Sequence, residues 1–148
     1  MKTYKPGLLN QLTEKARKEG IERFVVGAVI AINGKVLILR RTKEDFMGGI
    51  YELPSGKVEQ EETLEQALYR EIKEETGLNI KEILSYIKSF DYESASGKKT
   101  RQFNFLVVTK EGDIKISEEH DDYKLIGKNE VNSYNITDNV KEVILNAV

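Results

Sequence analysis

The segment from Thr63 to Gly77 is the clearest helix signal in this 148-residue chain. Thr63 and Gln66 have the spacing of a capping box, in which each side chain accepts a hydrogen bond from a backbone N–H at the start of the helix. Gly77 is placed to end the helix, because glycine adopts a left-handed conformation at little cost. The sequence therefore predicts a helix over residues 63–76, with one face packed against the rest of the fold.

This predicted helix carries acids on its apolar face. At about 100° per residue, with Glu71 as the zero direction, the apolar side chains lie between about −40° and +60°. Glu74 falls at about −60° and Glu75 at about +40°, so three carboxylates point where a packing helix would place leucines. The apolar residues that define the face are Leu64, Ala67, Leu68 and Leu78.

Three carboxylates on a packing face need a compensating charge. Buried and unpaired, they would cost free energy or take up protons. Arg70 and Lys73 point to other sides of the helix, although Arg70 could reach one acid. A divalent cation could neutralise the group, and oxygen ligands without sulfur or histidine suit Mg²⁺ or Mn²⁺. A solvated acidic surface is the alternative, and spacing alone leaves both interpretations open.

Composition restricts the classes of function. The chain has no cysteine and one histidine, His120, which excludes disulfides and argues against zinc sites and Ser-His-Asp triads. The net charge of −2 gives no reason to expect stable nucleic-acid binding. The N-terminus lacks the apolar segment of a signal peptide, and no apolar run approaches the roughly 20 residues of a membrane span. We therefore expect a cytoplasmic protein without a membrane partner.

The remaining pattern predicts a single domain over residues 1–148. Asn33-Gly34, between two apolar runs rich in β-branched residues, is the strongest short-range signal for a hairpin with a type I′ turn. Strands and helices are mixed without strict alternation, so an α/β sandwich around a mixed sheet is favoured over a doubly wound parallel sheet. The expected strands are 24–32, 35–41, 50–53, 80–90, 102–109 and 123–126, and further helices are expected at about 8–19 and 138–147, the last capped by Thr137.

The acidic helix and the loop before it resemble the Nudix box, G-x5-E-x7-R-E-U-x-E-E-x-G-U, where U is a bulky aliphatic residue. Every specified position of the box, from Gly56 to Leu78, agrees with the pattern. The matching residues are Gly56, Glu62, Arg70, Glu71, Ile72, Glu74, Glu75, Gly77 and Leu78. The preceding segment Tyr51–Pro54 is also similar to the family, whereas Ser55 stands where many members carry glycine.

The resemblance to the Nudix family, and to its MutT-like members, implies an α/β/α sandwich with a central mixed sheet. It also implies a metal-dependent pyrophosphohydrolase that cleaves the phosphoanhydride bond of a nucleoside diphosphate linked to another group. The implied ligands of Mg²⁺ or Mn²⁺ are Glu71, Glu74, Glu75 and the backbone carbonyl of Gly56. Arg70 would orient a glutamate of the box by ion pairing, and Glu62 would hold the loop or reach the metal through water.

The resemblance leaves the general base open. Some members of the family use a glutamate of the box, and others use an acid from a later loop. Glu71 is the first candidate, and Glu118 or Glu119 is the later one. A solvated acidic turn is the ordinary interpretation of Glu118 and Glu119.

Three residues are candidates for substrate binding. Arg40 and Arg101 could contact substrate phosphates, although solubilising surface charge is the ordinary role of such arginines. Asn139 resembles in position an asparagine that reads the purine edge in MutT-like members, although asparagine is also a common helix cap.

Aromatic side chains and the single histidine are further candidates for the site. Tyr51 and Phe46 could stack on a base, whereas Phe105 is expected in the core. His120 lies in an acidic turn, and we expect it at the surface.

The resemblance to the Nudix family leaves two classes of function. A hydrolase could act on nucleoside triphosphates, including oxidised purines, or on ADP-ribose-like sugar nucleotides, and the lack of long insertions favours a triphosphate. The alternative is a non-catalytic domain that binds a nucleotide metabolite for regulation. Such domains often lose glutamates of the box, and none is missing here. Homodimers are common in the family, so a homodimer is also left open.

Overall fold

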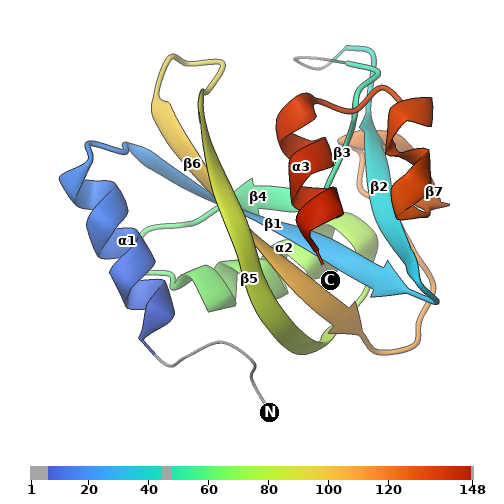
Figure 1. The fold of residues 1–148 in the computed structure, drawn as a ribbon, viewed down its shortest axis with the longest axis horizontal. Coiled ribbons are helices and arrows are strands. Elements are labelled where there is room, and N and C mark those ends of the chain that lie inside the picture. Colours follow the sequence, from blue (N-terminus) through green and yellow to red (C-terminus); the bar gives the residue numbers. More distant parts are fainter. Residues whose placement is uncertain (1–6, 45–47, 148) are drawn as a thin grey trace.

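The computed structural model describes residues 7–44 and 48–147 and places helices on both faces of a β-sheet (Figure 1). The strands are β1 (Arg23–Ile32), β2 (Lys35–Arg41), β3 (Tyr51–Glu52), β4 (Ser55–Lys57), β5 (Ile80–Glu93), β6 (Lys99–Thr109) and β7 (His120–Ile126). The helices are α1 (Leu8–Lys18), α2 (Leu64–Thr76), a 3-10 helix η1 (Lys128–Ser133) and α3 (Asp138–Asn146). None of the helices in these residues is long and apolar enough to cross a membrane.

The sheet is mixed, as predicted. Its order is β3-β2-β1-β6-β5, with β4 paired to β1 and β7 paired to β2. Strands β1 and β6 run parallel, and the other pairs are antiparallel. The predicted hairpin is confirmed, because Asn33 and Gly34 both have positive φ, 50° and 77°, and Ile32 pairs with Lys35.

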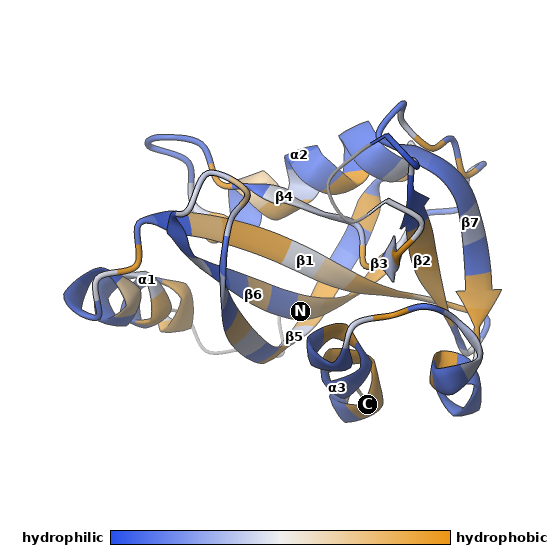
Figure 2. Ribbon diagram, turned by 90° about the horizontal axis from the view of Figure 1, so that it is seen from above, coloured by the Kyte–Doolittle hydropathy of each residue, from blue (hydrophilic) through white to orange (hydrophobic). Residues whose placement is uncertain are grey.

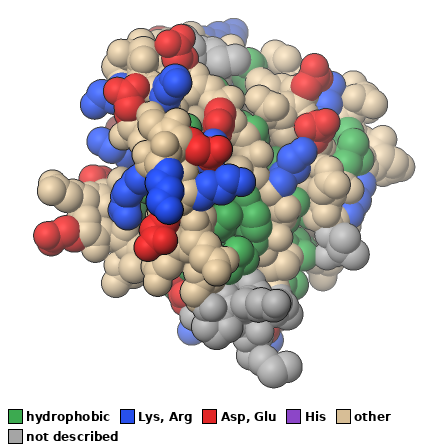
Figure 3. All heavy atoms as spheres, turned by 60° about the vertical axis from the view of Figure 1, so that its left-hand side comes forward, with side chains coloured by type: hydrophobic (Ala, Val, Ile, Leu, Met, Phe, Trp, Pro, Cys, Tyr) green, Lys and Arg blue, Asp and Glu red, His purple; other side chains and the backbone are tan. Residues whose placement is uncertain are grey.

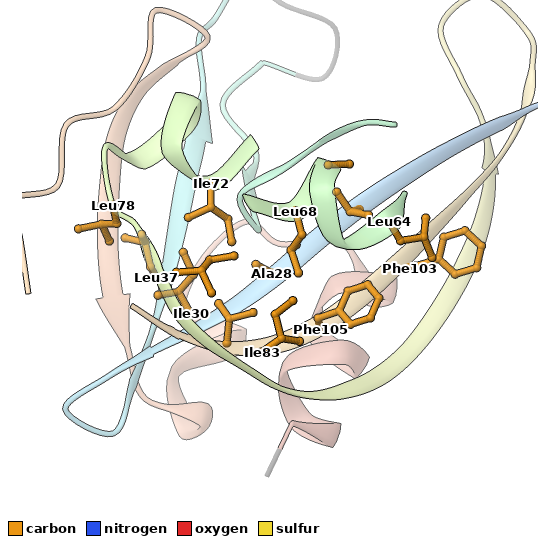
Figure 4. Close-up of a cluster of buried hydrophobic side chains, with 14 of the residues drawn as sticks. Ala28, Ile30, Leu37, Leu64, Leu68, Ile72, Leu78, Ile83, Phe103 and Phe105 are labelled. Carbon is orange, nitrogen blue, oxygen red and sulfur yellow. The ribbon is translucent and has the colours of Figure 1, made fainter. Parts of the chain in front are cut away.

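Alternation along β1 divides the core into two layers. Successive side chains of a strand point to opposite faces of the sheet. Ala28 and Ile30 pack beneath α2 together with Phe105 of β6 (Figure 4). Val29 and Leu106 belong to a second cluster under α3. Strand β1 is buried on both faces over its middle, and Figure 2 shows it as largely hydrophobic.

Helix α2 is attached to the sheet by apolar side chains. Leu64, Leu68 and Ile72 are almost completely buried against β1 and β6 (Figure 4). Burying each such side chain contributes roughly 1.5–3 kcal/mol to stability, before the entropy of ordering is subtracted. Packing therefore fixes the rotation of α2, and with it the direction of every glutamate on the helix.

The strands differ from the sequence-based expectation mainly at their ends. Strand β5 extends beyond its expected end to Glu93. Strand β6 begins earlier than expected, at Lys99, and β7 also begins earlier, at His120. Strand β4 and the 3-10 helix were not expected. Ser55-Gly56-Lys57 has no apolar pattern, and it is extended because the edge of β1 offers a partner for its backbone, with Gly56 opposite Val26. Pairing partners of this kind are invisible to local propensity.

The packing of α2 can be tested with one pair of variants. Replacing the buried Leu68 by alanine should lower the free energy of unfolding by about 2–5 kcal/mol, because the lost methyl groups leave a cavity. The same change at Leu145, which is exposed on α3, should cost about 0.5 kcal/mol or less. Urea unfolding measures both values, and equal losses would contradict the described orientation of α2.

Candidate active site

Helix α2 has the predicted ends. The Thr63 hydroxyl accepts a hydrogen bond from the backbone N–H of Gln66, and the Gln66 side-chain oxygen accepts one from the N–H of Thr63. Gly77 follows the helix with φ 75° and donates its N–H to the carbonyl of Lys73. These caps satisfy backbone groups at both termini, so the acidic residues between them lie on a well-formed helix.

The three glutamates of the helix do not share one environment. Glu75 is 5% exposed, the side chain of Glu71 is 13% exposed, and that of Glu74 is 57% exposed. The expectation that all three point inward was therefore wrong for Glu74. Leu78 was used to orient the packing face, but it lies beyond the helix, whereas the buried Ile72 turns the face toward Glu75.

Arg70 joins the outer acids to the loop before the helix. Its guanidinium donates two hydrogen bonds of 2.8 Å to Glu62 and one of 2.6 Å to Glu71, and its Nη1 lies 3.4 Å from Glu74. It also donates to the backbone carbonyl of Lys57 at 2.9 Å. The expectation that Arg70 could reach one of the three helix acids was too narrow, since it contacts two of them, Glu71 and Glu74. Hydrogen bonds from Arg70 lower the pKa of Glu62 to about 2.

Gly56 lies directly under the carboxylate of Glu71. A Cβ at position 56 would overlap all three carboxylate atoms of Glu71, so only glycine permits this approach. Burial raises the pKa of Glu71, while the hydrogen bond and the charge of Arg70 act in the opposite direction. The Nudix box thus brings Gly56 and Glu71 together although they are separated by fifteen positions of sequence.

Glu75 is the innermost acid, and its charged neighbours are also acids. Its Oε1 accepts a 2.8 Å hydrogen bond from the backbone N–H of Ser55. Burial raises the pKa of Glu75 to about 9, and the charges of Glu52 and Glu119 add to the rise. The carboxyl of Glu119 lies against that of Glu75 and raises its pKa further. The late acid Glu119 therefore belongs to the same group as the box glutamates.

His120 is buried, contrary to the expectation of a surface residue. A β-bulge at Asp121 places His120 opposite Arg41 of β2, which turns its ring inward. His120 Nε2 lies 2.8 Å from Glu52 Oε2, and the other oxygen of Glu52 accepts from Arg41 at 3.2 Å. Glu52 is thereby held between two nitrogen donors beside Glu75, a role that sequence reasoning missed because it depends on the pairing of β2 with both β3 and β7.

A cleft of about 480 Å³ opens on the α3 side of the sheet and reaches this acidic group through Glu52 and Ser55. Tyr51, Phe90 and Tyr92 provide aromatic surface along it, and Asn139 stands at the start of α3. The remaining lining residues are Arg23, Arg41, Ile50, Leu53, Glu93, Ser94, Ala95, Gln102, Thr137 and Val140. Arg23 was not among the expected substrate contacts.

Only one of the three expected substrate-binding residues lines the cleft. Asn139 lines the cleft, whereas Arg40, which is not among the lining residues, pairs with Asp121 at 2.7 Å. Arg101 lies on the opposite face, paired with Asp91 and with Glu19 after α1. Figure 3, turned to bring that side of the molecule forward, shows basic and acidic side chains interspersed.

The aromatic residues considered for base stacking or for the core also lie in different places. Tyr51 lines the cleft and donates its hydroxyl to Asp122 at 2.7 Å. Phe105 is in the core, as expected. Phe46 lies outside the described residues.

A NUDIX domain model matches residues 22–146 of the sequence. The chain belongs to the NUDIX domain family. This result confirms the resemblance inferred from the box, and it leaves helix α1 outside the matched region.

The Nudix domain is similar to several known proteins. An 8-oxo-dGTP diphosphatase of Proteus vulgaris is 43% identical over 54 residues, which cover 36% of this chain and 48% of that protein. An RNA pyrophosphohydrolase of Campylobacter jejuni is 29% identical over 131 residues, covering 80% and 82%. The crystal structure of a MutT NUDIX hydrolase from Burkholderia pseudomallei has a TM-score of 0.75 at 24% identity, covering 85% and 98%, and this likeness concerns the fold.

The shared region is short in many of these relatives. The matched part spans only 48%, 40% and 40% of three curated relatives. Family membership and fold are therefore established for this Nudix domain, and its activity and substrate are matters for proposal.

The buried charge of Glu75 predicts a pH-dependent stability. In the absence of metal, the folded-state pKa of about 9 lies above the unfolded value near 4.5. The native state then binds more protons at this residue, so the contribution of Glu75 to stability is most favourable below about pH 4.5 and falls as pH rises from about 5 to 9. Glu75→Gln, which keeps an acceptor for Ser55, should raise the free energy of unfolding at pH 8 by about 1–3 kcal/mol.

The exposed Glu74 provides the control for this prediction. Glu74→Gln should change stability by about 0.5 kcal/mol or less. Urea titrations in EDTA at pH 5 and pH 8 measure both variants. A Glu75→Gln protein that is less stable than the unsubstituted chain at pH 8 would show that the carboxylate is compensated within the protein.

Proposed function

We propose that this chain is a metal-dependent pyrophosphohydrolase that cleaves the phosphoanhydride bond of a nucleoside diphosphate linked to another group. The observation that carries the proposal is the buried Glu75, which lies beside Glu119 and Glu52 at the end of a cleft with the volume of a small-molecule site. A fixed group of acids beside a cleft suits a polyanionic substrate only if cations accompany it. The substrate class follows from this charge and from the family.

We assign Mg²⁺ or Mn²⁺ to this site, with Glu71, Glu74, Glu75 and the carbonyl of Gly56 as the groups that would hold it. All are oxygen donors, which these ions prefer. Burial and the neighbouring acids Glu52 and Glu119 oppose ionisation of Glu75, and a cation would relieve this, which supports the fit. In residues 7–44 and 48–147 no three acids or histidines form a ready-made metal cage, and Arg70 contacts both Glu71 and Glu74. Arg70 and the cation would therefore share these two carboxylates.

When bound, the divalent ion offsets phosphate charge and lowers the pKa of its water. The chain's own residues supply position and a proton acceptor. Arg70 holds Glu71 over Gly56 and anchors the loop at Glu62 and Lys57. These contacts keep the loop close to the end of the cleft.

We assign the role of general base to Glu119, with Glu71 as the second candidate. The carboxyl of Glu119 contacts that of Glu75, and it lies in the loop before β7 rather than on the helix. Glu71 already accepts a hydrogen bond of 2.6 Å from Arg70, which occupies one of its oxygens. Glu118 is the neighbouring acid and provides a matched comparison.

Within the proposed class, nucleoside triphosphates, including oxidised purines, are favoured over ADP-ribose-like sugar nucleotides. The relative named as an 8-oxo-dGTP diphosphatase supports a triphosphate, and the volume of the cleft is sufficient for one nucleoside. A non-catalytic nucleotide-binding domain is the alternative, and the complete set of box acids argues against it. We expect a cytoplasmic enzyme acting on small molecules, as a monomer or a homodimer.

A substrate panel tests the proposed activity. The protein is incubated with nucleoside triphosphates, 8-oxo-dGTP, ADP-ribose, NADH, dinucleoside polyphosphates and a 5′-triphosphorylated RNA, and the products are separated. Turnover of at least one compound with Mg²⁺ or Mn²⁺, and none in EDTA, is expected. Glu75→Gln should reduce metal-dependent turnover by at least about a hundredfold while the protein stays folded. Metal-independent turnover, or full activity in this variant, would overturn the metal assignment.

The assignment of the base is tested by two neighbouring substitutions. Glu119→Gln should lower kcat by about 10²–10⁴-fold, because the proton acceptor is lost. Glu118→Gln should change kcat by less than about threefold, since the corresponding surface charge has little effect on the reacting atoms. Steady-state kinetics across pH 6–9 measures both. Full activity in Glu119→Gln would transfer the role to Glu71.

A further inference from the structure

Two buried amides lie on the face of β6 that forms the floor of the cleft. Gln102 is 6% exposed and Asn104 is fully buried. They share this face with Leu106, whereas Phe103 and Phe105 point to the opposite layer. Gln102 lines the cleft, and Asn104 lies next to it along the strand. Buried amides on an otherwise apolar sheet face need a specific set of hydrogen bonds.

Backbone carbonyls determine which way Asn104 points. Its Nδ2 donates to the carbonyl of Lys88 at 3.1 Å and to that of Gln102 at 3.2 Å. A carbonyl oxygen can only accept, so the opposite orientation of the Asn104 amide would place oxygen against oxygen. The Oδ1 of Asn104 is therefore directed away from both carbonyls and toward Gln102.

The orientation of Asn104 determines that of Gln102 in turn. Gln102 Nε2 donates to Asn104 Oδ1 at 2.8 Å. Reversing the Gln102 amide would bring its Oε1 against Oδ1, an unfavourable contact between two acceptors. The network therefore leaves Gln102 Oε1, a hydrogen-bond acceptor, as the amide atom that is not turned toward Asn104.

Gly27 of β1 makes room for this pair. A Cβ at position 27 would overlap Asn104 Oδ1 and Gln102 Nε2. Gly27 also pairs with Ser55 of β4, whose N–H binds Glu75. The missing side chain thus allows the amide pair to lie beside the strand that supports the acidic group.

We propose that Gln102 Oε1 accepts a hydrogen bond from the exocyclic amino group of the substrate's base. The inference rests on the proposed function, which places phosphates at the acidic end of the cleft and the nucleoside along it. Phe90 and Tyr92, paired with Gln102 and Thr100 of β6, border the same space and offer flat apolar surface for a base. With a base against these rings, Gln102 Oε1 would face the exocyclic amino group at the edge of the base.

This geometry selects a substrate class. Adenine and cytosine carry an amino donor at the position where hypoxanthine and uracil carry a carbonyl acceptor. A carbonyl facing Gln102 Oε1 would leave two acceptors in contact in a nearly dry site, which is a strong basis for rejection. Gln102 is therefore a specificity-determining residue that favours adenine and cytosine nucleotides over their deaminated counterparts.

Matched nucleotide pairs test this inference. For the unsubstituted protein, kcat/KM should be at least about tenfold higher for ATP than for ITP and for CTP than for UTP. Gln102→Met, which has similar length and no amide oxygen, should reduce both ratios to about one. Gln11→Met on the exposed surface of α1 is the control and should keep both ratios.

A binding experiment separates this inference from the proposed function. Calorimetry with AMP against IMP, and CMP against UMP, reports base preference without metal or turnover. A Gln102-dependent preference in a protein that hydrolyses nothing would refute the proposed activity and keep the base assignment. An unsubstituted protein without preference in either assay, or a folded Gln102→Met protein that retains it, would overturn the role of Gln102. Absence of a base preference in the unsubstituted protein is decisive even if the Gln102→Met variant does not fold.

Discussion

The hydrogen bond from the backbone of Ser55 to the buried carboxyl of Glu75 is the contact around which the site is built. It attaches the packed face of α2 to β4, the short strand at the edge of β1. A single neutral donor compensates only part of a buried charge, and the adjacent acids Glu52 and Glu119 increase the deficit. The fold therefore places an acid whose ionisation is unfavourable next to a cleft, which is a typical property of functional sites rather than of packing.

The positive charge of Arg70 compensates the acids that lie further out, Glu62, Glu71 and Glu74. Arg70 binds Glu62 and Glu71 and reaches Glu74, so these residues hold the loop against the helix. Its contacts leave Glu75 without a share of the arginine charge. This division explains how one helix can contain both a structural ion-pair network and a charge deficit. It also gives the box glutamates different environments although their spacing in the sequence suggests equivalence.

Features set by neighbouring residues were predictable, and features set by distant strands were not. The caps at Thr63 and Gly77 and the turn at Asn33-Gly34 follow from local backbone preferences, and all three are present. The position of His120 depends on a β-bulge in the pairing of β7 with β2, which no local pattern reveals. The sequence also misplaced the packing face of α2, because Leu78, which lies beyond the end of the helix, was counted as part of that face. The sequence also did not reveal that Arg101 lies on the face of the sheet opposite to the cleft, where it pairs with Glu19.

The acidic group and the cleft share one corner of the fold, and this connection gives the departure at Ser55 a simple explanation. What binds Glu75 is the backbone N–H at this position, which glycine would supply equally well. The side chain at position 55 instead borders the cleft, close to Gly27 and the amide pair of β6. A change from glycine to serine therefore leaves the support of the acid intact and alters the surface that a nucleoside would contact. Variation at this corner can alter the surface of the cleft without disturbing the acids of the proposed site, because the two tasks use different atoms of the same residue.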